Sequence, residues 1–160
     1  MPSHKGRSAG RQRLPVLLER DELELRTWLQ LVRTYLRMER RLERLLEERG
    51  LSLPQFDILA TLAMGEGITQ QELAQRMLVT KGNICGMIDR METNGWVERR
   101  PDKQDRRANR LFLMPAGRKQ LARSFPDQHA AVQEMMGALR PEELQTLYEF
   151  LDRLEEDIEN

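Results

Sequence analysis

The sequence feature that most constrains the fold is residues 68–110, where two short helical segments and a basic hairpin follow one another. Thr69 and Glu72 stand at the spacing of a capping box, which predicts that a helix begins there and ends near Met77. A tight turn then leads to a second helix that starts at Thr80. Because so short a connection forces neighbouring helices to pack together, this stretch predicts a helix-turn-helix.

The second helix has one apolar stripe and one open face. Ile84, Met87, Ile88 and Met91 recur at helical spacing and are expected to be buried. The remaining positions are free to project elsewhere: Thr80, Lys81, Asn83, Gly86 and Arg90. Asn94-Gly95 is typical of a left-handed helix end, and we expect Thr80 to cap the helix at its start.

A basic hairpin is predicted next. Residues 96–99 and 110–113 are strand candidates, and the loop between them is too polar to be core. Residues 97–110 contain six basic and three acidic side chains, so the hairpin has a net charge of +3. The formal net charge of the whole chain is zero, so a polyanion would meet local basic patches such as this one and not a uniformly basic protein.

Long amphipathic helices flank this region. We expect helices over residues 21–48, over 52–65 (with a capping box formed by Ser52 and Gln55), from Pro115 onwards, and over 141–158. Pro126 is expected to kink or break the third of these. The last segment, residues 141–160, carries eight acidic side chains and one basic one, which argues that its polar faces point away from nucleic acid. The first helix outgrows the small domain that it precedes, so part of its apolar stripe should face another subunit.

Composition excludes several classes of function. One cysteine and two histidines provide neither a disulfide framework nor a common zinc site, so we expect no metal and no cofactor. The apolar runs are too short to span a membrane, and residues 1–12 lack the apolar segment of a secretory signal, which favours a cytoplasmic protein. The sequence contains no nucleophile–base or paired-carboxylate arrangement and no phosphate-cradling glycine loop, so no catalytic residue is proposed and an enzyme is not expected.

The local motifs resemble the MarR family of bacterial transcriptional regulators over roughly residues 21–158. The resemblance rests on Leu53-Pro54-Gln55-Phe56-Asp57-Ile58-Leu59, Thr69-Gln70-Gln71-Glu72-Leu73-Ala74, Ile88-Asp89-Arg90-Met91-Glu92, Gly95-Trp96-Val97-Glu98-Arg99, Asp105-Arg106-Arg107 and the Gly117 that follows. It implies a mainly α fold with a small β-hairpin wing, which is a winged helix-turn-helix with long N- and C-terminal dimerisation helices. The expected organisation is a basic tail over residues 1–20, a helical dimerisation region over 21–50 and 115–160, and a DNA-binding domain over 51–114.

The resemblance also implies a homodimer that places its second reader helix in the major groove of double-stranded DNA and its wing at the minor groove. The residues expected to contact DNA are Thr69, Gln70, Thr80, Lys81, Gly82, Asn83, Cys85, Gly86, Arg90, Lys103, Arg106 and Arg107, with Asp105 bracing the wing by charge pairing. Two positions depart from the family pattern. Gly86 replaces a longer polar side chain, which puts base reading from that turn in doubt, and Met114 replaces a capping threonine.

Elementary chemistry agrees with these roles. The N–H groups at the start of a helix bind phosphate, which suits Thr80 and Lys81. An asparagine such as Asn83 can pair with adenine through two hydrogen bonds, although plain surface polarity explains that residue equally well. Arginines favour narrow minor grooves because the negative potential there is strongest, which suits the wing.

Five residues have a structural and a functional interpretation. Asp57 and Arg90 are expected to form a salt bridge between packed helices, or else the polar edge of an effector pocket. Trp28 and Tyr35 are expected in the core or dimer interface, or else in that pocket. Cys85 is expected to be a small groove-facing residue, with oxidant sensing as the alternative.

The sequence therefore predicts a sequence-specific DNA-binding regulator, a repressor that binds a pseudo-palindromic operator as a homodimer. Release by a small aromatic or phenolic effector is a further expectation. The alternatives are a redox-responsive regulator that uses Cys85 and a winged-helix protein-interaction module that does not bind DNA.

Overall fold

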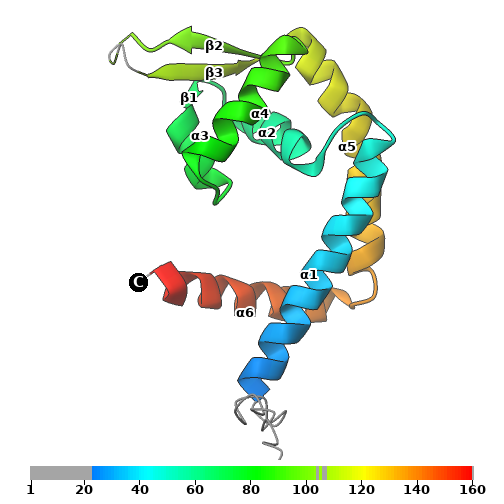
Figure 1. Ribbon diagram of the computed structural model, residues 1–160. Coiled ribbons are helices and arrows are strands. Elements are labelled where there is room, and N and C mark those ends of the chain that lie inside the picture. The colour runs from blue at the N-terminus through cyan, green and yellow to red at the C-terminus, as the bar shows by residue number, and fades with distance from the viewer. Residues whose placement is uncertain (1–22, 104, 106–107, 160) are drawn as a thin grey trace, which may run out of the picture. The chain divides into compact units, whose positions relative to one another are not determined.

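The computed structural model describes residues 23–103, 105 and 108–159, and Figure 1 shows the order of its elements. The described residues fall into two units, one ending at Leu36 and one beginning at Arg37. Helix α1 (Leu23–Glu47) contributes to both. Its part in the first unit exposes large apolar side chains to solvent: Leu23, Trp28, Leu29, Leu31, Tyr35 and Leu36.

The second unit contains the remaining helices and a small sheet. Its elements are α2 (Leu53–Met64), β1 (Ile68–Thr69), α3 (Gln70–Arg76), α4 (Lys81–Thr93), β2 (Val97–Pro101), β3 (Asn109–Leu113), α5 (Pro115–Met136) and α6 (Pro141–Glu159). The sheet is antiparallel with strand order β1-β3-β2, and Arg99 pairs with Leu111 in the hairpin. Strand β1, which pairs Ile68 with Leu111, was not expected from the sequence. The predicted fold class, a mainly helical chain with a β-hairpin wing, is confirmed.

The helix boundaries follow from local hydrogen bonds. Capping boxes form at Ser52 and at Thr69, as the sequence predicted. Helix α4 ends in a Schellman arrangement, in which the N–H of Gly95 bonds to the Glu92 carbonyl and the N–H of Trp96 to the Met91 carbonyl, at 2.8 and 2.9 Å. Gly95 has a φ of +67°, a backbone conformation that glycine adopts without the cost other residues incur.

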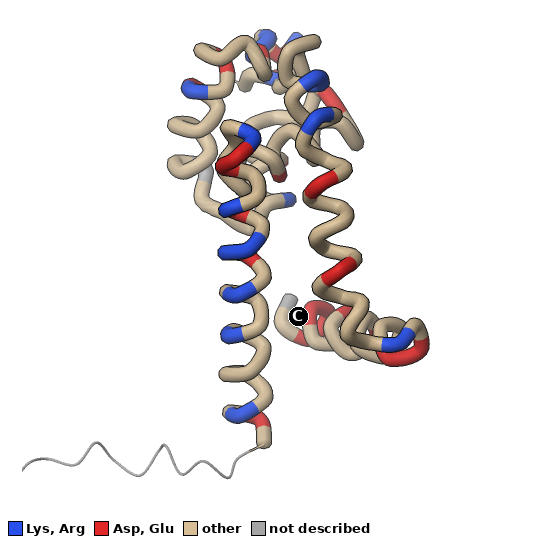
Figure 2. The backbone as a smooth tube through the Cα atoms, turned by 90° about the vertical axis from the view of Figure 1, so that its right-hand side faces the viewer, with Lys and Arg blue, Asp and Glu red and all other residues tan. Residues whose placement is uncertain are grey.

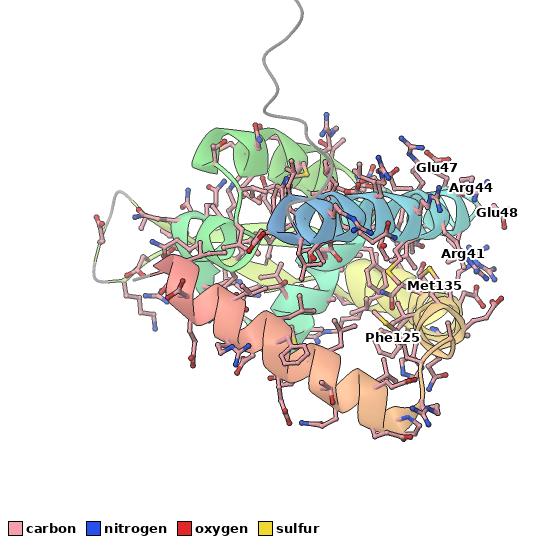
Figure 3. The ribbon with its side chains drawn as sticks, turned by 90° about the horizontal axis from the view of Figure 1, so that it is seen from below. Arg41, Arg44, Glu47, Glu48, Phe125 and Met135 are labelled. Atoms are coloured by element: carbon pink, nitrogen blue, oxygen red, sulfur yellow. The ribbon has the colours of Figure 1, made fainter. Side chains whose placement is uncertain are left out.

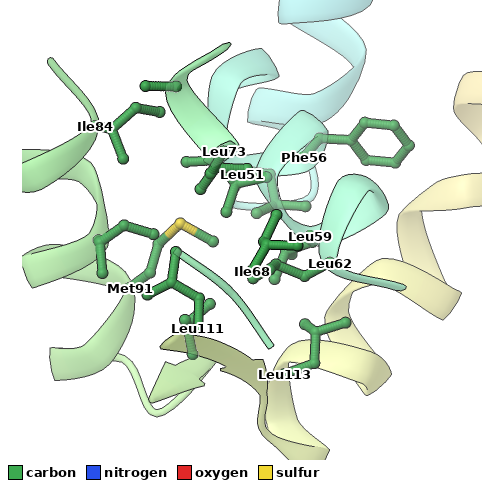
Figure 4. Packing of buried hydrophobic residues seen from close by; sticks show 14 of the residues in the cluster. Leu51, Phe56, Leu59, Leu62, Ile68, Leu73, Ile84, Met91, Leu111 and Leu113 are labelled. Carbon is green, nitrogen blue, oxygen red and sulfur yellow. The ribbon is translucent and has the colours of Figure 1, made fainter. Parts of the chain in front are cut away.

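One hydrophobic core fixes the reader helices to the sheet. Figure 4 shows Leu59 and Leu62 of α2 meeting Leu73 of α3 and Met91 of α4, with strand residues closing the cluster. Leu111 of β3 is fully buried in it. Each helix therefore reaches its place by burying one apolar stripe, and the opposite stripe of each stays at the surface.

Of the kink or break expected at Pro126, the break does not occur, and the kink stays a prediction. Helix α5 continues through that residue to Met136. Proline removes one backbone N–H, which costs about 3 kcal/mol in a helix interior. Ala131, beyond Pro126, is buried and α5 packs against α2, and we infer that this packing outweighs the lost hydrogen bond.

Two ion pairs join the end of α1 to α5 within the second unit. Arg41 pairs with Glu134, and Arg49, just after the helix, pairs with Asp127. Figure 3 shows Arg41 on the side of α1 that faces α5, where Met135 also lies. The Arg41 guanidinium, by hydrogen bonding and then by its charge, lowers the pKa of the Glu134 carboxyl. These contacts connect the segment before α2 to the helix that follows the sheet.

Helix α6 is amphipathic but buries little in the protomer. Its apolar face is exposed at Tyr148, Leu151, Leu154 and Ile158. Figure 2 shows acidic positions along the rest of the helix. Among the described residues, no helix has both the length and the apolar composition needed to cross a membrane.

The capping box at the start of α3 makes a testable contribution to stability. The Thr69 hydroxyl accepts the N–H of Glu72 at 3.1 Å, and Glu72 accepts the N–H of Thr69. Loss of such a cap typically costs about 1 kcal/mol, so Thr69→Ala should lower the free energy of unfolding in urea by about that amount. Thr80→Ala is the matched control, because Thr80 makes no side-chain capping bond to the described backbone, and its unfolding midpoint should hardly change.

The same cap should weaken in acid. The N–H and then the hydroxyl of Thr69 lower the pKa of the Glu72 carboxyl below its ordinary value. A carboxyl with a lowered pKa stabilises the fold above its unfolded pKa and loses that contribution as the pH falls through the folded one. Thr69→Ala keeps this backbone N–H and removes only the hydroxyl, so the difference between wild type and the variant should shrink partly in acid. An equal difference at neutral and acidic pH would contradict this account.

Candidate nucleic-acid interface

Helices α3 and α4 are joined by a tight turn that presents the start of α4. Leu78 lies in this turn with a φ of +53°, a left-handed conformation that is uncommon for a branched side chain. Thr80 is the N-cap of α4, as expected, but its hydroxyl makes no capping hydrogen bond to the described backbone. The expectation that Thr80 caps α4 is therefore confirmed, and the cap does not depend on its side chain. Its exposed hydroxyl remains available for another partner.

The outward face of α4 has few large side chains, because two of its exposed positions are glycines. Ile84, Ile88 and Met91 are fully buried, as the stripe predicted. On the opposite side Gly82, Asn83, Gly86 and Arg90 are exposed. A Cβ built at Gly82 or Gly86 would meet no described heavy atom within 4 Å. Another surface could therefore approach the backbone of α4 closely, and Asn83 is the polar side chain that stands between the two glycines.

Gln70 and Cys85 lie further inside than expected. Both are half-buried, and the Gln70 amide donates to the Cys85 sulfur at 3.4 Å. The amide oxygen of Gln70 accepts from the guanidinium of Arg99, a residue of β2, at 3.3 Å. Both ends of the Gln70 amide are thus engaged inside the protein. Gln70 is placed to support α4 more directly than to contact a ligand.

The base of the wing is held by a buried carboxylate. Asp102 follows β2 and is almost completely buried, and it pairs with Arg110 of β3. Arg110 also donates to the Gly67 carbonyl at 2.6 Å, which ties the hairpin to the loop before β1. The backbone N–H of Asp105 donates to the Asp102 carboxylate at 3.1 Å. Asp102 therefore holds both strands and the start of the wing loop.

The outer surface of the wing is basic. Arg100 pairs with Glu98 and lies over the Phe112 ring, 4.3 Å from its centroid. Lys103 is exposed. The expected wing-tip contacts Arg106 and Arg107, and the side chain of Lys81, lie outside the described residues. The expectation that Asp105 braces the wing through an arginine at the tip depends on those residues and stays a prediction.

One expected ion pair is absent. Within the described residues no salt bridge joins Asp57 to Arg90, and both side chains are exposed. The interpretation of these two residues as a structural pair was wrong because Arg90 projects from the outward face of α4. Partial desolvation nevertheless raises the pKa of Asp57. Trp28 and Tyr35 are exposed side chains of the first unit, so they are not core residues of the protomer.

Four functional positions were missed by reasoning from the sequence: Glu92, Arg99, Asp102 and Arg110. Each acts through a pairing between elements. Arg99 reaches back to α4, and Arg110 reaches both Asp102 and the Gly67 carbonyl. For Arg99, Asp102 and Arg110 the available signal was the mixture of acidic and basic residues in the hairpin, which was interpreted only as a basic surface. Pairing the two strands in register would have brought Asp102 and Arg110 close together.

Taken together, the helix pair, the exposed face of α4 and the β-hairpin define a winged helix-turn-helix protein. A model of the MarR family matches residues 49–108. An HTH-type transcriptional regulator of Bacillus cereus is 31% identical over 128 residues, which cover 79% of this chain and 85% of the relative.

Two solved structures with bound DNA are similar to this chain. Sco3205, a MarR family transcriptional regulator from Streptomyces coelicolor in complex with DNA, has a TM-score of 0.80 and 26% identity, covering 86% of this chain and 88% of that one. The transcriptional repressor CouR, bound to a 23-mer DNA duplex, has a TM-score of 0.75 and 26% identity, covering 86% and 97%. This chain belongs to the MarR family of transcriptional regulators.

Proposed function

We propose that this protein is a sequence-specific DNA-binding regulator that places α4 in the major groove. The observation that carries the proposal is the outward face of α4, where exposed Gly82, Asn83 and Gly86 leave the backbone open to close approach. In this arrangement Asn83 contacts a base edge, and the free hydroxyl of Thr80 with the first N–H groups of α4 binds a phosphate. The DNA complexes of Sco3205 and CouR support this use of the fold.

The wing supplies the second contact. The Asp102–Arg110 pair joins the two strands where the wing loop begins, and the sequence of that loop contains Lys103, Arg106 and Arg107. We propose that these cations bind the phosphates and the minor groove beside the major-groove site. Because α4 has few side chains long enough to read bases, much of the specificity depends on Asn83, on the wing and on the spacing of two half-sites.

The active form in this proposal is a homodimer that acts as a repressor. The exposed apolar residues of α1 and α6 are the surfaces that a second copy covers. Two copies of α4 then reach half-sites about one helical turn apart, which predicts a pseudo-palindromic operator. Repression is supported by the similarity to CouR, which is a transcriptional repressor. Release by a small aromatic or phenolic effector is supported by the family resemblance. Trp28 fluorescence, followed during titration with such acids, would test that part.

The wing contact predicts a change in salt dependence. Arg107→Ala should weaken binding to an operator selected from a random DNA pool, because fewer counterions are released. The slope of log affinity against log salt should fall by about 0.9 for each phosphate contact removed, and the dimer has two such sites. Fluorescence anisotropy over a range of salt concentrations measures both quantities.

The control for this experiment is Arg123→Ala, which removes an exposed arginine of α5. Its salt slope should equal that of wild type. An unchanged slope in Arg107→Ala would contradict wing–phosphate contact. Unaltered operator affinity after Lys81, Arg106 and Arg107 are all changed to alanine would show that these side chains do not contact DNA. A wild-type protein that selects no duplex from the pool would instead favour a winged helix that binds only proteins.

A further inference from the structure

Arg99 has more polar partners than its neighbours in the hairpin. Its guanidinium lies 2.7 Å from the Asp89 carboxylate and also pairs with Glu92, both on α4. It donates to the Gln70 amide oxygen of α3 at 3.3 Å and to the Cys85 carbonyl of α4 at 3.4 Å. Only 19% of its side chain is exposed. One residue of β2 thus contacts both helices of the reader.

The chemistry of arginine suits this position. A guanidinium presents its donors in a planar fork, so it can bind a carboxylate and an amide oxygen at the same time. The side chain of Glu92 also accepts the backbone N–H of Arg99 at 2.8 Å, which would survive a change of the Arg99 side chain. The link from β2 to α4 therefore has a backbone component. The link to α3 depends on the guanidinium alone.

Arg99 is poorly placed to touch DNA itself. Its guanidinium faces two carboxylates, Asp89 and Glu92, which offset its attraction for phosphate. Arg100, the next residue, differs from Arg99 in its exposure and in the elements that it contacts. It is exposed, lies over the Phe112 ring and pairs with Glu98 of its own strand. The chain thus contains an inward arginine and an outward arginine side by side.

We propose that Arg99 is the positioning residue of the DNA reader, which sets the orientation of α4 relative to α3 without contacting DNA. This inference rests on the proposed DNA-binding function. Three contacts connect these residues. Arg99 pairs with Glu92 and donates to the amide oxygen of Gln70, and Gln70 donates to the sulfur of Cys85, which lies one turn before Asp89 in α4. A small rotation of α4 would move Asn83 away from its base while phosphate contacts, which tolerate displacement, persist.

The test compares Arg99→Lys and Arg99→Met with wild type, and uses Arg100→Met as the matched control. Affinities for a selected operator and for a random duplex are measured at one salt concentration, together with the salt slope and the unfolding midpoint. A lysine keeps the charge opposite Asp89 and Glu92, but as a point charge it cannot also bridge to Gln70 and the Cys85 carbonyl.

Both Arg99 variants should lose about tenfold in the ratio of operator to random-duplex affinity, comparable to one mismatched base pair. Their affinity for the random duplex and their salt slope should equal those of wild type, and Arg99→Lys should unfold close to wild type. Arg100→Met should keep the full affinity ratio. If Arg99→Met fails to fold, the comparison of Arg99→Lys with wild type decides the test.

Three results would overturn the proposal. An unchanged affinity ratio in Arg99→Lys would show that the bridge to α3 does not orient α4. A uniform loss on both DNAs with a shallower salt slope would show that Arg99 binds phosphate directly. A wild-type protein that binds operator and random DNA equally would remove the proposed function, which distinguishes that failure from the first two.

Discussion

Gly117→Ala is expected to lower the free energy of unfolding by about 3 kcal/mol, the upper end of the usual cost of overpacking a core. Gly117 is buried in the first turn of α5, and its neighbour Trp96 lies between the end of α4 and the start of β2. A Cβ at this position would lie 2.2 Å from the Trp96 carbonyl oxygen and 3.1 Å from the Leu113 side chain. That carbonyl accepts the N–H of Met114 at 2.9 Å, so it cannot move away without breaking a hydrogen bond.

The expected loss is measured by urea denaturation, with Trp96 fluorescence as a local probe. Gly86→Ala is the matched control, because a Cβ there meets no described atom within 4 Å. Alanine favours a helix interior over glycine by about 1 kcal/mol, so Gly86→Ala should stabilise the fold by a similar amount. A Gly117→Ala protein as stable as wild type would show that the start of α5 can move away from β2.

Elements whose sequence signals lie within a few neighbouring residues were predicted well. The capping boxes at Ser52 and Thr69 depend on residues three positions apart, and both form. The stop at Gly95 needs one residue with a positive φ, and the stripe of α4 needs only helical spacing. Such signals act within one or two turns of chain, so the sequence displays them directly.

Features that depend on packing between distant segments were not predicted. Helical spacing alone could not show that α5 is unbroken at Pro126, because the packing of this helix against α2 is tertiary. The two-residue strand β1 exists only because β3 offers it a partner. Arg99 and Asp102 were interpreted as members of a charged hairpin, and only the fold reveals which carboxylate or guanidinium each one meets.

The residues of the candidate site also fall into a group that the sequence predicts and a group that it does not. Its outward residues, Gly82, Asn83 and Gly86, follow from the helical period once the buried stripe is known. Its inner supports do not, since Gln70 and Cys85 become neighbours only when α3 packs on α4. The identity of the reader helix is therefore predictable from sequence, whereas the residues that orient it require coordinates.

The apolar face of α6 gives the prediction with the largest functional effect. Among the described residues Leu151 is 40% exposed and Leu154 is 53% exposed, and large apolar side chains of α1 are exposed as well. We propose that a second copy covers both faces, so charges introduced on α6 should separate the subunits. Leu151→Lys with Leu154→Lys is expected to be a folded monomer at micromolar concentration, because neither side chain belongs to the core around α2, α3 and α4.

The affinity for operator DNA should fall when the dimer separates into monomers. A linked pair of readers gains roughly a hundredfold or more over one reader, because the second half-site is bound at high effective concentration. The double lysine variant should therefore lose at least about a hundredfold in operator affinity while its reader domain stays intact. Gln145→Lys, on the polar side of the same helix, is the control and should remain dimeric. Sedimentation velocity and operator titration measure the two effects. A dimeric double variant would exclude α6 from the interface, and a monomeric wild type would contradict the homodimer itself.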